Sequence, residues 1–91
     1  MKKIRIPIIF HPPTWEEYTA EEIASEVLMN AFSACKIDIP EMTDSLAESI
    51  EWLEMFERDV VSFRKKCKIT FEGDYYPDRP LVTGTLILHI N

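Results

Sequence analysis

A row of glutamates in the middle of the chain is the most regular set of reactive side chains in the sequence. It consists of Glu48, Glu51, Glu54 and Glu57. On a helix, this three-residue spacing brings neighbouring carboxylates close enough to hold a cation. Carboxylate metal sites in helical bundles also use a Glu-x-x-His motif, which this sequence lacks. We therefore interpret the row as a solvated acidic helix face and expect no metal site.

The two histidines are the next candidates, because histidine is the usual general acid or base near neutral pH. His11 precedes two prolines and is close in sequence to Glu16, whereas His89 falls on the polar side of an expected strand. Neither has a companion at the spacing of a known catalytic motif. We expect no catalytic residue and a protein that is not an enzyme, with His11 beside Glu16 as the only feature that favours the contrary.

The cysteines and glycines do not form a catalytic, metal-binding or phosphate-binding motif either. Cys35 and Cys67 lie far apart, without CxxC spacing and without a nearby histidine, so no zinc or redox motif is formed. We interpret both as buried thiols in a reducing compartment. The sequence contains neither Gly-x-Ser-x-Gly nor a glycine-rich phosphate loop. We therefore expect no cofactor.

Length and composition limit the architecture that could position any site. The chain has 91 residues, of which 46% are hydrophobic, so we expect residues 1–91 to form a single domain with a modest core. No apolar run approaches the ~18 residues of a membrane helix. The first residues lack the small-residue cleavage site of a secretory signal. These features predict a soluble cytoplasmic protein that does not contact membranes.

Three stretches have the two-residue hydrophobic alternation of half-buried strands. The first runs from Lys3 to Phe10, and Pro7 within it predicts an edge position or a bulge. The second runs from Cys67 to Glu72. The third, from Leu81 to Ile90, is the most apolar, so we expect it to be the central strand with the other two beside it.

Two helices are expected between the first and second strands. Thr19 and Glu22 match a capping box, as do Thr14 and Glu17, and an apolar stripe continues to Cys35. A longer helix is expected from Thr43 to Lys66. The order β-α-α-β-β predicts an α+β two-layer sandwich, with a three-stranded, mainly antiparallel sheet and both helices on one face. The other face would be lined by Ile9, Thr83, Thr85, Ile87 and His89.

Charge is distributed unevenly along the chain. Residues 11–57 hold twelve acids and one base, a net charge of −11, and the remaining residues hold nine bases and four acids, a net charge of +5. The whole chain carries −6, which argues against direct nucleic-acid binding. The helices are therefore expected to be strongly acidic. Solubility alone could account for this charge.

A sharper interpretation is that the acidic helices dock on the basic surface of a larger protein, such as a nucleic-acid channel. Aromatic and methionine side chains among the acids would then anchor the contact. Alternatively, these side chains pack at the rim of the core. The residues expected in this contact are Trp15, Glu16, Tyr18, Glu48, Glu51, Trp52, Glu54 and Met55.

The stretch EGDYYPDRP, from Glu72 to Pro80, is longer than a tight hairpin requires. We expect a connection of about eight residues here. Its prolines restrict the backbone, and its two tyrosines offer large surfaces with few rotamers. This composition favours a second contact surface. It would be formed by Tyr75, Tyr76, Asp78 and Arg79.

Two hypotheses follow from the sequence. The first is a small, acidic, non-enzymatic inhibitor or regulator that blocks a basic site on a larger protein. It predicts binding that weakens with salt and with charge reversal at Glu48, Glu51 and Glu54. The size and charge are typical of proteins of phages and other mobile elements, which is an association only. The second hypothesis is a homo-oligomeric protein that binds or sequesters a small ligand, using the open sheet face and an edge strand to form a homodimer.

Overall fold

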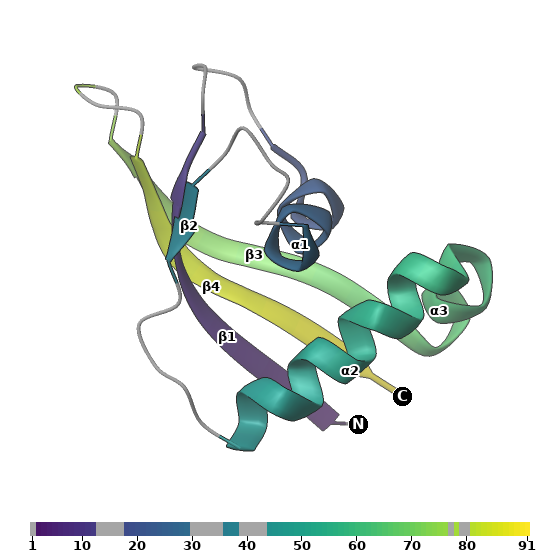
Figure 1. The fold of residues 1–91 in the computed structure, drawn as a ribbon. Helices are drawn as coiled ribbons and strands as arrows, with labels where there is room; N and C mark the ends of the chain where they lie inside the picture. The colour runs from purple at the N-terminus through teal and green to yellow at the C-terminus, as the bar shows by residue number, and fades with distance from the viewer. Residues whose placement is uncertain (1, 13–17, 30–35, 39–43, 77, 79–80) are drawn as a thin grey trace.

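The computed structural model describes residues 2–12, 18–29, 36–38, 44–76, 78 and 81–91. These residues form an antiparallel sheet and three helices, which confirms the expected α+β class (Figure 1). The elements in chain order are β1 (Lys2–His11), α1 (Ala20–Leu28), β2 (Lys36–Asp38), α2 (Asp44–Arg58), α3 (Val60–Lys66), β3 (Cys67–Tyr76) and β4 (Leu81–Ile90).

The three long strands are arranged as the hydrophobic pattern predicts. The strand order is β2-β1-β4-β3, so β4 lies between β1 and β3. β1 pairs with β4 from Lys2↔Ile90 to Phe10↔Val82. The short strand β2 adds to one end of β1, between the two expected helices, so the sheet has four strands and the predicted number of three is wrong. Three residues are too few for hydrophobic alternation to predict a strand.

Pro7 lies in a part of β1 that β2 does not cover. β2 pairs only with Ile9, Phe10 and His11, whereas Pro7 is paired with Thr85 of β4. Among the described residues, no strand pairs with the other side of β1 at Pro7. A proline whose nitrogen faces this uncovered side costs no ladder hydrogen bond. The predicted edge position of Pro7 is correct, although β1 as a whole is not the last strand.

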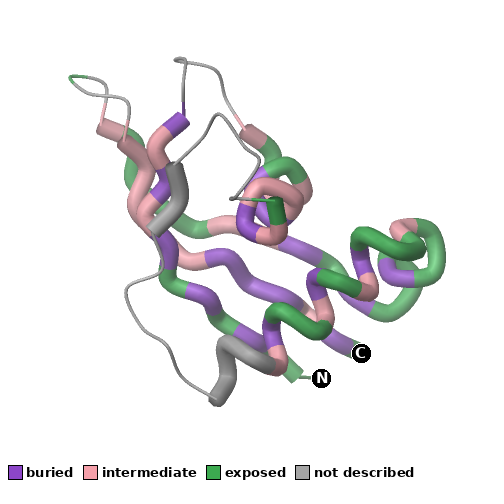
Figure 2. Tube along the Cα trace, viewed as in Figure 1, coloured by how far each residue is buried: buried purple, intermediate pink, exposed green. Residues whose placement is uncertain are grey.

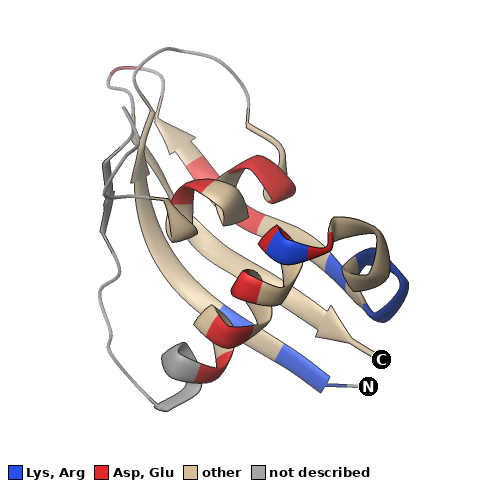
Figure 3. Ribbon diagram, turned by 45° about the vertical axis from the view of Figure 1, so that its right-hand side comes forward, with Lys and Arg blue, Asp and Glu red and all other residues tan. Residues whose placement is uncertain are grey.

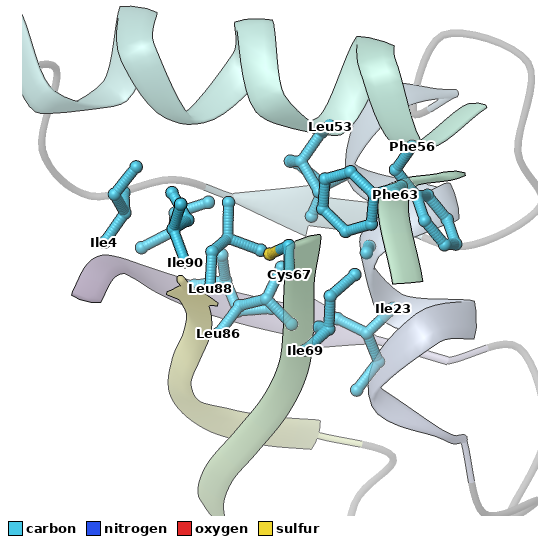
Figure 4. Close-up of a cluster of buried hydrophobic side chains, with 14 of the residues drawn as sticks. Ile4, Ile23, Leu53, Phe56, Phe63, Cys67, Ile69, Leu86, Leu88 and Ile90 are labelled. Carbon is cyan, nitrogen blue, oxygen red and sulfur yellow. The ribbon is translucent and has the colours of Figure 1, made fainter. Parts of the chain in front are cut away.

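The core combines apolar side chains from the three long strands and from the helices. Burial alternates along β1, and every second residue from Ile4 to Phe10 is buried (Figure 2). All three helices contribute side chains to this cluster, so the same apolar contacts hold the helices on the sheet (Figure 4). The helical members are Ile23, Ala24, Val27, Leu53, Phe56 and Phe63.

α1 begins where the capping box predicts. The Thr19 hydroxyl accepts a hydrogen bond from the Glu22 N–H at 3.1 Å, and the Glu22 carboxylate accepts one from the Thr19 N–H at 3.3 Å. The helix ends at Leu28, so the predicted extension to Cys35 is wrong; Cys35 itself lies outside the described residues. The alternative start at Thr14 and Glu17 is also outside them.

The predicted helix from Thr43 to Lys66 is divided in two. Asp59 leaves the helical conformation, with φ −148° and ψ 83°, and its carboxylate accepts a hydrogen bond from the Ser62 N–H at 3.1 Å. It therefore caps α3. Phe56 and Phe63, one on each side of the break, pack with ring centroids 5.2 Å apart. The hydrophobic row continues across the break, which is why periodicity predicts one helix.

This cap predicts a pH dependence of stability. The hydrogen bond from the Ser62 N–H lowers the pKa of Asp59 below its ordinary value, so the capping contribution is present at neutral pH and is lost as pH falls through the lowered value. Asp59→Ala should lower the melting temperature at pH 7 and show a smaller loss in acid. Asp59→Asn keeps an acceptor and should stay close to the wild type at pH 7. Melting curves at several pH values measure both, and identical pH profiles for wild type and Asp59→Ala would contradict the capping role.

Candidate protein-docking face

The exposed surface of α2 carries the acidic row. Leu53 and Phe56 face the sheet, which turns Glu51, Glu54 and Glu57 outward. All three carboxylates are exposed, and α1 adds the exposed Glu22 (Figure 3). The helical spacing that buries the apolar row therefore presents a continuous acidic row to solvent. We refer to Glu51, Glu54 and Glu57 as the acidic row.

Glu48 differs from the acidic row because it has a partner within the chain. Its carboxylate forms an ion pair with the ammonium group of Lys2 in β1. Both side chains are partly exposed, so we expect the pair to contribute little to stability. It does offset one negative charge at this end of α2. Glu48, expected in the contact, is therefore a weaker candidate than Glu57.

Trp52 and Met55, expected as apolar anchors among the acids, line a hollow. Both are partly buried and pack against the core, and the Trp52 ring meets the Phe63 ring edge-on with centroids 6.3 Å apart. This arrangement matches the alternative in which they pack at the rim of the core. With Phe63 they line a hollow of about 290 Å³ between α2 and α3. Its remaining lining residues are Arg58, Asp59, Ser62 and Lys66.

The other aromatic residue expected on this face also packs inward. Tyr18 meets the buried Phe10 edge-on, with ring centroids 4.9 Å apart, and is only partly exposed. It therefore extends the core at the start of α1. Trp15 and Glu16 lie outside the described residues.

The expected eight-residue connection after Glu72 is wrong. β3 continues to Tyr76 and pairs with β4 up to Tyr76↔Leu81, which leaves four residues, 77–80, between the strands. Tyr75 and Tyr76 are consecutive strand residues, so they point to opposite faces of the sheet. Tyr75 is 46% exposed, Tyr76 is partly buried and Asp78 is exposed. Arg79 lies outside the described residues, and the tyrosines do not form one contact loop.

The outer face of the sheet is less open than expected and is basic at one end. The register places Lys3, His89 and Lys68 side by side, and Arg5, Ile87 and Thr70 in the next row. Ile87 is only 3% exposed, and the His89 Nε2 lies 2.7 Å from the Thr70 hydroxyl. The cations of β1 and β3 are far apart in the sequence, and the strand register places them in neighbouring rows on either side of β4.

No metal-binding group was found where side chains are described: no three His, Cys, Asp or Glu residues come together there. Cys67 is a buried free thiol, as expected, and burial raises its pKa to about 11. None of the described helices is both long and apolar enough to cross a membrane.

Comparison with known proteins adds no relative: no family model matches the chain, and no match was found among curated proteins or solved structures. The fold and the site define a small α+β domain. On it, an exposed acidic row lies beside a shallow hollow with an aromatic lining.

Proposed function

We propose that this protein is a small, acidic, non-enzymatic binding module that inhibits or regulates a larger protein by docking on its basic surface. The observation that carries the proposal is the acidic row of α2 lying beside the hollow lined by Trp52, Met55 and Phe63. The proposal assumes the two-layer arrangement, in which α1 and α2 cover one sheet face and leave their outer surfaces to the partner.

The acidic row orients the partner and accelerates association. Like charges three residues apart destabilise a helix slightly, because they repel each other. Opposite charges on a partner would relieve that repulsion. Exposed ion pairs contribute only about 0.2–1 kcal/mol each, but complementary fields accelerate association and select the partner. A surface rich in lysine and arginine, such as a nucleic-acid channel, matches this row.

The hollow supplies the larger part of the binding free energy. Apolar and aromatic groups that become fully buried dominate protein interfaces, and Trp52, Met55 and Phe63 offer such a surface. The cations Arg58 and Lys66 also line the hollow, so an uncharged apolar or aromatic side chain suits it better than a lysine. We therefore expect a partner with basic residues around one protruding apolar side chain.

The test compares two variants that change net charge equally. Glu51→Lys/Glu54→Lys reverses the acidic row, and Glu72→Lys/Asp74→Lys reverses two exposed acids on the outer face of β3. A partner captured from the native host at low salt and identified by mass spectrometry is purified, and calorimetry measures each dissociation constant. We expect the first variant to weaken binding about 10- to 100-fold, because two attractions become repulsions, and the second to change it less than about threefold.

Salt provides the independent readout. Raising salt from about 50 mM to about 500 mM should weaken wild-type binding steeply and affect the first variant far less, because screening removes an attraction that the variant lacks. A partner that binds equally well with the acidic row reversed, and at both salt concentrations, would contradict the proposal.

The second hypothesis, a homo-oligomeric ligand-binding protein, stays a proposal with less support. Two residues that it places on an open sheet face are not freely available there, because Ile87 is buried and His89 contacts Thr70. Small-ligand sites are usually concave and enclosed, whereas this face is a sheet surface. An origin in a phage or mobile element also stays a hypothesis.

A further inference from the structure

The two ends of the sheet are protected very differently against pairing with another chain. At one end, β2 is only three residues long, and the part of β1 beyond it contains Pro7. Short edge strands and prolines are common devices against edge-to-edge association. At the other end lies β3, the last strand in the sheet order, with ten residues and β4 on one side only.

β3 lacks these protective devices. It contains no proline, and its pairing with β4 runs without a break from Cys67↔Ile90 to Tyr76↔Leu81, so it has no bulge. No strand of the described chain pairs with its other side. The backbone groups on that side are therefore a template for one more strand.

The charges on β3 show which strand would fit. Lys68 lies in the first half of the strand and Glu72 and Asp74 in the second half; all three are exposed and alternate onto the outer face. A second copy can pair with β3 in antiparallel orientation in two symmetric registers. With Phe71 on the two-fold axis, Lys68 of one copy lies opposite Asp74 of the other. With Thr70 on the axis, Lys68 lies opposite Glu72. A parallel, in-register pairing would place each charged residue opposite the same residue of the second copy, so like charges would face each other.

We propose that the protein forms a two-fold symmetric homodimer by antiparallel pairing of β3 with β3 of a second copy, giving one continuous sheet. Two-fold interfaces require a self-complementary surface, and the opposite charges in the two halves of β3 provide one. The half-buried Phe71 and the exposed Tyr75, on the other face of the strand, add apolar contact across the edge.

The positions of α1 and α2 are compatible with such pairing. α1 packs over β3, and its Glu21 lies with Arg64 and Lys68 around a hollow of about 240 Å³, so cations accompany the acid there. α2 packs over β1, toward the other end of the sheet (Figure 1). The dimer therefore leaves the acidic row exposed on both copies, and it goes beyond the proposed docking function without depending on it.

The test uses two variants. Each should dimerise poorly with itself, and the two should form a heterodimer when mixed. Lys68→Glu makes the outer face of β3 wholly acidic, and Glu72→Lys/Asp74→Lys makes it basic. Each should weaken its own dimer at least about tenfold, because like charges face each other twice across the axis. Mixed together, they restore opposite charges in either symmetric register. Both variants keep a negative net charge, so overall attraction does not favour the mixture.

Sedimentation velocity and light scattering, from about 1 µM to about 1 mM, measure the dimer, whose mass is twice 10.7 kDa. An interface of one strand edge is small, so we expect a dissociation constant in the micromolar range or weaker. Lys3→Glu, on β1 and separated from β3 by β4, is the control with the same charge change and should dimerise like the wild type. A wild type that stays monomeric at about 1 mM would overturn the proposal. So would a dimer that Lys68→Glu leaves unchanged, or single variants that do not prefer each other. None of these results bears on binding through the acidic row.

Discussion

Replacing Leu53 by alanine should lower the free energy of unfolding by about 2–5 kcal/mol. Leu53 is fully buried on the inward side of α2, and Figure 4 shows it among side chains from several elements. Truncation removes its apolar contacts and leaves a cavity that the surrounding strands can fill only in part. Urea unfolding followed by circular dichroism measures the change.

Ile50 provides the matched control for Leu53. It lies on the same helix but is 36% exposed, so Ile50→Ala should cost less than about 1.5 kcal/mol. The difference between the two variants measures how α2 is oriented on the sheet. Equal losses would mean that α2 is rotated, and the acidic row would then not face solvent as a unit.

Replacing Gly84 by alanine should destabilise the protein by at least about 2 kcal/mol. Gly84 of β4 is paired with Gly73 of β3. A β-carbon at Gly84 would contact the Glu72 carbonyl oxygen, and it would lie 2.6 Å from the Gly73 Cα and 2.8 Å from the Phe71 Cζ. Two of these atoms belong to the backbone, so the strands would have to separate or shift.

The ring of Phe71 explains why two glycines face each other here. A β-carbon at Gly73 would also come within 2.6 Å of this ring, so the aromatic side chain covers the space above both glycines. Phe71→Ala should destabilise the protein by itself, yet it should not rescue Gly84→Ala, because the backbone contacts remain. Thr85→Ala, on the opposite side of β4, is the control and should change stability little. Gly84→Ala with wild-type stability would contradict this packing.

Local patterns in the sequence predicted much of the secondary structure. Alternation along Lys3 to Phe10 identified β1, and the apolar stretch from Leu81 to Ile90 correctly identified the central strand. Thr19 and Glu22 fixed the start of α1, because a capping box involves only neighbouring residues. These features are encoded within a few residues, so they can be predicted without knowledge of the fold.

The mistakes fall where the decisive contact is not visible in a hydrophobic pattern. The break at Asp59 preserves the apolar row, and the polar residues of β3 resemble a loop although they pair with β4. The hollow beside Trp52 exists because α3 turns away from α2 and brings Phe63 and Lys66 to the same place. The candidate site was therefore only partly predictable: the acidic row followed from spacing, and the hollow did not.

The sequence by itself determined the hydrophobic alternation, the capping box and the position of the acidic residues along one helix, because each depends on the fixed geometry of a strand or helix. Only the tertiary structure decided that Glu48 is paired with Lys2, that Trp52 and Met55 line a hollow, and that β3 is the last strand of the described sheet. Each of these depends on contacts between residues distant in the chain, and the packing of whole elements sets those contacts.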